Sequence, residues 1–166
     1  MVKRMSPGVR EKVQHGILYI AAIVFCILWL SDAIAINKRI KHDELTIQSS
    51  AGRAASFLET YAEQGEGDSP LWLVCADTIN EYSILLSRYD IVLNTQKAFR
   101  KRRFTQKEAM LSYYTEKIAK NMQDNFELME PYVSELAEAF RLLSNDLYSS
   151  RAIEIMEKIH EETYRM

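Results

Sequence analysis

Hydrophobic residues form one unbroken block near the start of this chain and three amphipathic stretches after it. The block, residues 17–36, reads ILYIAAIVFCILWLSDAIAI and contains a single charge, Asp32. At about 1.5 Å of rise per residue, a helix of this length spans roughly 30 Å, which is the thickness of a bilayer's hydrocarbon core. The pattern therefore predicts a transmembrane helix over residues 17–36. It would follow a basic tail, residues 1–16, and precede a separate helical domain, residues 37–166.

A cleaved secretory signal is the alternative interpretation of the same block. The purely apolar part, residues 17–30, is short for a membrane span, and Ala33-Ile34-Ala35 has the small-x-small spacing that signal peptidases accept. A charged tail of sixteen residues is long for a cleaved signal, however. We expect the helix to be retained as a signal-anchor, with cleavage after Ala35 as the competing hypothesis.

The basic residues around the block give the predicted orientation. Positive residues favour the cytoplasmic side of a span. Four precede the block and three follow it: Lys3, Arg4, Arg10 and Lys12, then Lys38, Arg39 and Lys41. The difference of one favours a cytoplasmic N-terminus and a periplasmic or extracellular domain. A cytoplasmic domain is the open alternative.

Two amphipathic helices are predicted next, over residues 40–61 and 72–93. Their apolar residues recur at helical spacing, at Ile40, Ile47, Ala51, Ala54, Leu58 and Tyr61, then at Trp72, Ala76, Ile79, Tyr82, Leu86, Tyr89 and Leu93. Between them, residues 65–70 read Gly-Glu-Gly-Asp-Ser-Pro, in which glycine ends one helix and Pro70 suits the first turn of the next. The alanines of the first stretch predict that a neighbouring helix approaches closely.

The third stretch has the most regular pattern, with eleven apolar positions at steps of three or four. They are Leu111, Tyr114, Ile118, Met122, Phe126, Met129, Val133, Leu136, Phe140, Leu143 and Leu147. Pro131 should kink or divide this helix, and Ser149-Ser150 marks a break before a last amphipathic piece. Because no segment alternates with a period of two, the predicted fold is all-α. Helices of about 25, 25 and 40 residues predict an antiparallel three- or four-helix bundle, or a coiled-coil-like domain.

Cysteine usage excludes a disulfide framework. The chain has two cysteines, and Cys26 lies inside the apolar block, so Cys75 has no partner within the helical domain. Cys75 belongs to the apolar stretch 71–76 and is predicted to be a small buried hydrophobe rather than a nucleophile.

A basic cluster, Arg100-Lys101-Arg102-Arg103, is the first candidate binding site. The plainest interpretation is a solvated connection between helices. The second is contact with anionic lipid headgroups or another polyanion, since each basic residue contributes about 1 kcal/mol near a charged leaflet. Nucleic-acid binding comes last, because it would need a cytoplasmic domain and a larger patch.

The second candidate is an interaction face on the third stretch, where tyrosine, methionine and phenylalanine mix. It comprises Tyr114, Met122, Phe126, Met129 and Phe140. A face of this composition often meets another protein, whereas ordinary core and the lining of a ligand cavity are the alternatives.

Catalytic chemistry has little support in the sequence. The Glu157-x-x-His160 spacing occurs once, whereas di-iron bundles use two such motifs, and nucleophile and phosphate-loop motifs are missing. We therefore predict no enzyme, no cofactor and no metal site. The leading hypothesis is a structural or interaction subunit of a membrane-associated assembly, whose partners are lipid and other subunits or a second copy. A sensory or ligand-binding bundle and a secreted helical protein are the alternatives.

Overall fold

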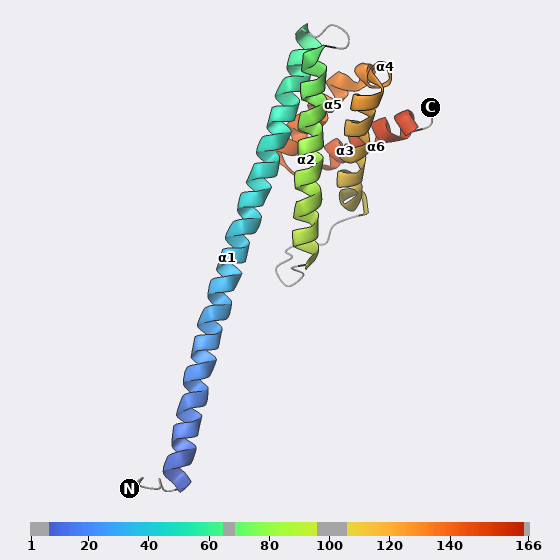
Figure 1. The fold of residues 1–166 in the computed structure, drawn as a ribbon. Helices are drawn as coiled ribbons and strands as arrows, with labels where there is room; N and C mark the ends of the chain where they lie inside the picture. The colour runs from blue at the N-terminus through green and yellow to red at the C-terminus, as the bar shows by residue number, and fades with distance from the viewer. Residues whose placement is uncertain (1–6, 65–68, 96–105, 165–166) are drawn as a thin grey trace. The chain divides into compact units, whose positions relative to one another are not determined.

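The computed structural model describes residues 7–64, 69–95 and 106–164, which form helices joined by short non-helical segments, with no strand among them (Figure 1). The elements are α1 (Pro7–Gln64), α2 (Pro70–Thr95), α3 (Gln106–Asp124), α4 (Phe126–Met129), a 3-10 turn η2 (Glu130–Tyr132), α5 (Val133–Asn145) and α6 (Ser150–Tyr164). The predicted all-α class is confirmed. Two compact units divide between Arg39 and Ile40, so that α1 contributes to both.

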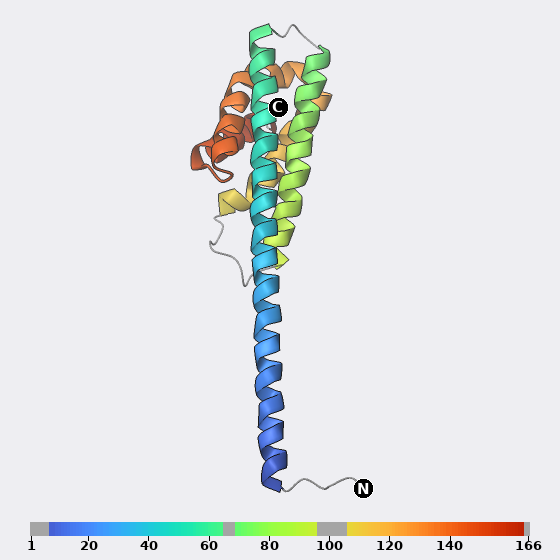
Figure 2. The ribbon, with the colours of Figure 1, turned by 90° about the vertical axis from the view of Figure 1, so that its left-hand side faces the viewer.

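In the second unit, α1 and α2 run side by side in opposite directions (Figure 2). Arg53 pairs with Glu81 at 2.8 Å, and further along α1 the ring of Tyr61 meets that of Trp72 near the start of α2, with centroids 5.2 Å apart. Ala51, Ala54 and Ala55 are completely buried, as their small size predicted for a helix that approaches closely.

The third apolar stretch is divided earlier than the proline alone suggested. Helix α3 ends at Asp124, and Asn125 leaves the helical conformation with φ −142° and ψ 77°. Pro131 then lies in η2, and α5 begins directly after it. A single helix of about 40 residues is therefore wrong, while a division is confirmed. The indole of Trp72 donates to the backbone oxygen of Met122 at 2.7 Å and so satisfies a carbonyl near the helix end that Asn125 creates.

Helices α5 and α6 form a second antiparallel pair. Glu135 pairs with Lys158 at 2.9 Å, and Glu138 lies 3.9 Å from Arg151, nearer the start of α6. The backbone N–H of Ala152 donates to the Ser149 hydroxyl at 3.5 Å, which suits the predicted helix start at this position. Helix α3 packs against both α2 and α6, and one continuous core joins all of these helices.

Candidate interaction surfaces

The most extended apolar surface lies on α1 within the first unit. Its large apolar side chains from Ile17 to Ile34 are exposed by 49% to 74%. Only 6% of the most apolar 18-residue window of this helix is buried within the chain. By length and composition the helix qualifies as a candidate membrane span, a test that a signal sequence also passes.

A second apolar surface lies on α2, opposite the side that enters the core. Leu73, Ile84 and Ile91 are 54%, 44% and 61% exposed. These residues are eleven and seven positions apart, so at 100° per residue they fall on one line along the helix. Asp77 and Arg88 are also exposed and border that line on one edge. We call these five residues the α2 outer face.

Sequence reasoning missed the α2 outer face, although the signal was present. The predicted stripe runs from Trp72 to Leu93, and those of its members whose side chains the structure describes are buried. Leu73 follows the first stripe residue by one position, and Ile84 and Ile91 follow Tyr82 and Tyr89 by two, so a second, sparser apolar line runs along the same helix. A helix with apolar residues on both sides is typical of one that contacts a partner on its outer side.

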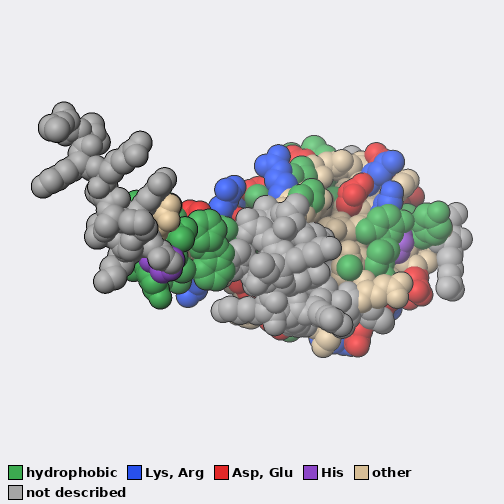
Figure 3. Space-filling model, turned by 90° about the horizontal axis from the view of Figure 1, so that it is seen from below, with side chains coloured by type: hydrophobic (Ala, Val, Ile, Leu, Met, Phe, Trp, Pro, Cys, Tyr) green, Lys and Arg blue, Asp and Glu red, His purple; other side chains and the backbone are tan. Residues whose placement is uncertain are grey.

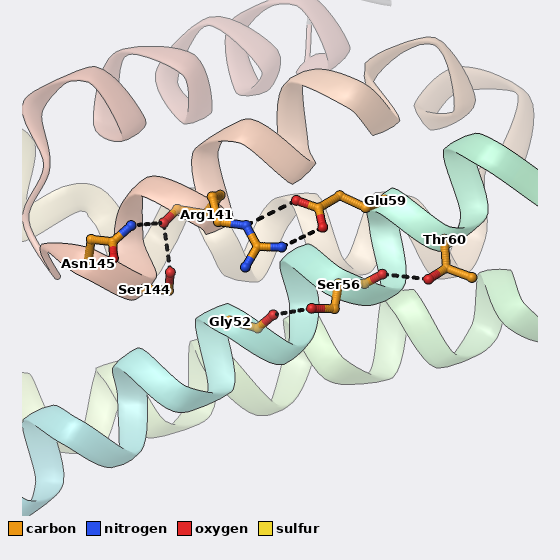
Figure 4. A network of polar contacts seen from close by, with 7 residues as sticks. All are labelled: Gly52, Ser56, Glu59, Thr60, Arg141, Ser144 and Asn145. Atoms are coloured by element: carbon orange, nitrogen blue, oxygen red, sulfur yellow. Dashed lines mark hydrogen bonds and ion pairs between the residues drawn. The ribbon is translucent and has the colours of Figure 1, made fainter.

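A polar network joins α1 to α5 (Figure 4). The Arg141 guanidinium donates two hydrogen bonds to the Glu59 carboxylate, one of them 3.0 Å from Nε to Oε1. The two helices come close beside it, because a Cβ added to Gly52 would lie 3.6 Å from that of Ser144. The Arg141 and Glu59 side chains are 48% and 43% exposed, so this pair contributes at most about 1 kcal/mol to stability. The Arg141–Glu59 ion pair links α5 to α1.

An aromatic cluster surrounds His160 on α6. The imidazole lies 5.3 Å from the ring of Tyr113 and 5.6 Å from that of Tyr164. Hydrophobic side chains border a histidine on the right-hand side of the space-filling view in Figure 3. Burial, together with the nearby charge of Lys117, lowers the pKa of His160 below its usual 6.5. The rings pack against one another, and Tyr114 of the same cluster donates to Glu157 at 3.4 Å. Glu157 and His160, the single Glu-x-x-His pair, are thus engaged with tyrosines.

An open groove of about 550 Å³ lies between α5 and α6. It is lined by Glu135, Glu138, Arg151, Glu154, Ile155 and Lys158. Its carboxylates and cations pair across it, and ligand pockets for small molecules are usually more apolar and more enclosed. Among the residues from 13 to 164 whose side chains are described, no three His, Cys, Asp or Glu side chains gather in a way that could hold a metal ion.

The two candidate sites from the sequence have different outcomes. Arg100, Lys101, Arg102 and Arg103 lie outside the described residues. Of the predicted interaction face, Tyr114 is 8% exposed and Met122, Met129 and Phe140 are completely buried, while Phe126 is half-buried with its ring 4.8 Å from that of Trp72. These five side chains pack within the chain's own core, so a partner has no access to most of them in the folded protein. The ordinary-core alternative is the one that this packing favours.

Cys75 is buried, as predicted. Its side chain is completely inaccessible, and burial raises the pKa of the thiol to about 11. A thiol with so little thiolate at neutral pH is a poor nucleophile and metal ligand, so its role is that of a small core residue.

Comparisons of this chain with known protein families, with curated proteins and with solved structures find no match.

Proposed function

We propose that this chain is a non-enzymatic, single-pass membrane protein whose residues 37–166 form an antiparallel helical bundle that docks with other protein subunits at the membrane. The observation that carries the proposal is the exposure of the apolar part of α1, of which only 6% is buried in its most apolar window. Each large aliphatic side chain left in water forgoes about 1.5–3 kcal/mol of burial free energy. The hydrocarbon core of a lipid bilayer removes these side chains from water, and its thickness matches the length of this apolar segment.

The second unit supplies the docking part of the proposal. Two antiparallel helix pairs, α1 with α2 and α5 with α6, share one core with α3. The α2 outer face remains uncovered by the described residues and offers apolar side chains with charges beside them. A face of this kind suits a protein partner, while the apolar part of α1 takes membrane lipid as its partner.

Membrane fractionation tests the anchor. We expect the full-length protein to stay in the membrane pellet after extraction at high pH and to enter solution only with detergent. Its intact mass should include residues 1–35. Recovery in the soluble fraction without those residues would contradict the anchor and support the secreted alternative with cleavage after Ala35.

Orientation is tested by labelling intact cells with a membrane-impermeant maleimide. We propose that residues 1–16 are cytoplasmic and that the bundle lies on the periplasmic or extracellular side, in line with the excess of one basic residue before the span. Ser134 on α5 is exposed, so Ser134→Cys provides a reporter, with the buried Cys75 as the internal control. Labelling of the Ser134→Cys variant at the introduced thiol in intact cells is the expected result, and protection until lysis would place the bundle in the cytoplasm.

A further inference from the structure

Exposed apolar side chains of the second unit gather on α1 and α2. Of the eight large hydrophobic side chains from residue 40 onward that the structure describes as exposed, six lie on these two helices: Leu45, Phe57, Leu73, Val74, Ile84 and Ile91. Helices α3, α5 and α6 complete the core on the other side of the α1–α2 pair, which lies in front of them in Figure 2. The α1–α2 pair therefore has a second, uncovered apolar side, and a partner that covers it has to match both helices.

The exposed side of α1 carries small side chains between larger ones. One line of exposed residues at steps of three or four, which we call the α1 outer stripe, comprises His42, Leu45, Ser49, Arg53 and Ser56. The Ser56 hydroxyl donates to the backbone oxygen of Gly52 at 3.0 Å, and the Thr60 hydroxyl donates to that of Ser56 at 2.8 Å (Figure 4). Because these hydroxyls already have acceptors within α1, another helix can approach the stripe closely without stranding a donor.

The register of α1 and α2 follows from their contacts. Arg53 pairs with Glu81, and Tyr61 meets Trp72 further along. Since the helices run in opposite directions, Leu45 is level with residues 88–89 of α2, and residue 49 is level with residues 84–85. A two-fold axis parallel to α1 keeps every residue at its own level, so this register also fixes which residues of two copies meet.

We propose that a second copy of this chain covers the uncovered side, with a two-fold axis parallel to α1 that places α1 of each chain against α2 of the other. The two hairpins then form a four-helix arrangement in which neighbouring helices are antiparallel. Both α1 helices run in the same direction, as two anchors in one membrane require. The pairing names the partner in the docking role proposed above, and it rests on that role for its setting at a membrane.

Large side chains of one helix meet small ones of the other in this arrangement. Ile84 of α2 is level with Ser49 of the other chain, where the serine leaves room for it. Leu45 falls between Ile84 and Ile91 of the other chain. An apolar side chain that enters the space between residues one heptad apart is the knob-into-hole contact of packed helices. Each chain buries three exposed aliphatic side chains in this way.

The exposed charges at the centre decide which helix faces which. Arg53 and Glu81 lie at one level, so α1 against α2 of the other chain gives four charges of alternating sign around the axis. Packing α1 on α1 and α2 on α2 would instead bring Arg53 to Arg53 and Glu81 to Glu81. Asp77 lies one turn from Glu81, within reach of the same arginine of the other chain. Arg88 is level with Leu45, where the exposed side of α1 is uncharged, and its long side chain reaches past the contact into water.

The size of the contact sets the expected affinity. Residues 42–60 of α1 and 73–91 of α2 cover about 27 Å of helix, and two helices of about 10 Å diameter make the contact roughly 20 Å wide. Each chain buries on the order of 500 Å², which in total is close to the 1,000 Å² or so that a specific interface needs. We therefore expect a dissociation constant on the order of micromolar in detergent, and tighter association in a membrane, where the anchors hold both copies in one plane.

Sedimentation of the full-length protein in mild detergent measures the dimer. Ser49→Phe and Ile84→Lys change exposed residues at the centre of the contact, and each should weaken the dimer by about tenfold or more. Ser134→Phe, at an exposed position on α5, is the matched control and should leave the dimer unchanged. Every variant should keep the wild-type helix content and a cooperative thermal transition. Each should also stay in the membrane fraction, so failure of this pairing is distinguishable from failure of the anchor.

A mixing experiment separates contacts between chains from the ion pair within each chain. Arg53→Glu alone and Glu81→Arg alone leave like charges at the centre, so each homodimer should be weaker than the wild type by about tenfold. A mixture of the two variants places acids of one chain against bases of the other and should dimerise to within about threefold of the wild type, although the repulsion within each chain is unchanged. Glu116→Arg, a charge reversal at an exposed position on α3, should leave the dimer unchanged.

Disulfide cross-linking in a Cys26→Ala background reports the arrangement of the helices. Chains with Ser49→Cys and chains with Ile84→Cys should form a linked heterodimer when mixed. Neither should link to itself, because the two copies of each position lie diagonally across the four helices, roughly 13 Å apart. A wild-type chain that is monomeric at about 100 μM would overturn the proposal and leave the uncovered side to a different protein. So would a mixture without a gain in affinity, or a dimer linked through Ser49→Cys alone.

Discussion

Replacing Trp72 with phenylalanine removes one hydrogen bond from the core while keeping an aromatic ring in place. The indole Nε1–H donates to the Met122 carbonyl at 2.7 Å, and Trp72 is 1% exposed, so water cannot replace the donor. A buried carbonyl left unpaired costs about 1–3 kcal/mol. We therefore expect Trp72→Phe to lower the free energy of unfolding by that amount.

Trp72→Ala also removes the packing around the ring. The ring centroids of Tyr61 and Phe126 lie 5.2 and 4.8 Å from that of Trp72, from α1 and α4 respectively. Truncating a large buried aromatic to alanine costs about 3–5 kcal/mol, which is a large part of the 5–15 kcal/mol or so that holds a typical domain folded. Because the ring joins three elements, we expect their packing to loosen together.

Thermal unfolding of the full-length protein in mild detergent, followed by far-UV circular dichroism, measures both effects. For a unit of this size, 1 kcal/mol shifts the melting temperature by about 3–5 °C. Trp72→Phe should melt roughly 3–15 °C lower than the wild type and Trp72→Ala lower again. Trp29→Phe is the matched control, because Trp29 is 61% exposed and should leave the melting of the helical unit unchanged. A Trp72→Phe variant that melts within 1 °C of the wild type would refute the argument.

Three further predictions concern single side chains. Cys75, whose thiol pKa is raised to about 11 by burial, should resist maleimide at pH 7.5 in the folded protein and react after denaturation, as peptide mass spectrometry would show; equal labelling in both states would contradict its burial. Gly52→Ala should raise the free energy of unfolding by up to about 1 kcal/mol, because alanine favours a helix and the new methyl would lie at an ordinary contact distance, 3.6 Å, from the Cβ of Ser144. A lower melting temperature would show that the methyl does not fit between α1 and α5. Burial and the charge of Lys117 lower the pKa of His160 in the folded protein, so the neutral imidazole contributes its full stability above about pH 6.5, and that contribution is lost as the pH falls through the pKa of the folded state. His160→Phe should therefore flatten the dependence of the unfolding free energy on pH between pH 7 and 5. An unchanged dependence would contradict the lowered pKa.

Local periodicity was a good guide to which side chains are buried. Of the eleven apolar positions predicted from Leu111 to Leu147, all but Phe126 are buried, and Phe126 is half-buried. The pattern was reliable because each helix of an all-α protein must bury a stripe with a 3.6-residue period. Periodicity could not locate the end of α3, since an apolar stripe continues across a short non-helical segment as long as the same core lies beneath it.

The sequence by itself determined the all-helical class, the apolar block of α1 and the buried side of each later helix, because these depend on composition and on spacing within a few residues. Tertiary structure decided what depends on residues far apart in the chain. The break at Asn125 is accommodated by Trp72, fifty residues from the carbonyl that it satisfies. In the same way, only packing placed Met122, Met129 and Phe140 in the core and left Leu73, Ile84 and Ile91 of the α2 outer face exposed. A side chain's accessibility is set by which neighbour covers it, and the spacing of apolar residues in one helix does not contain that information.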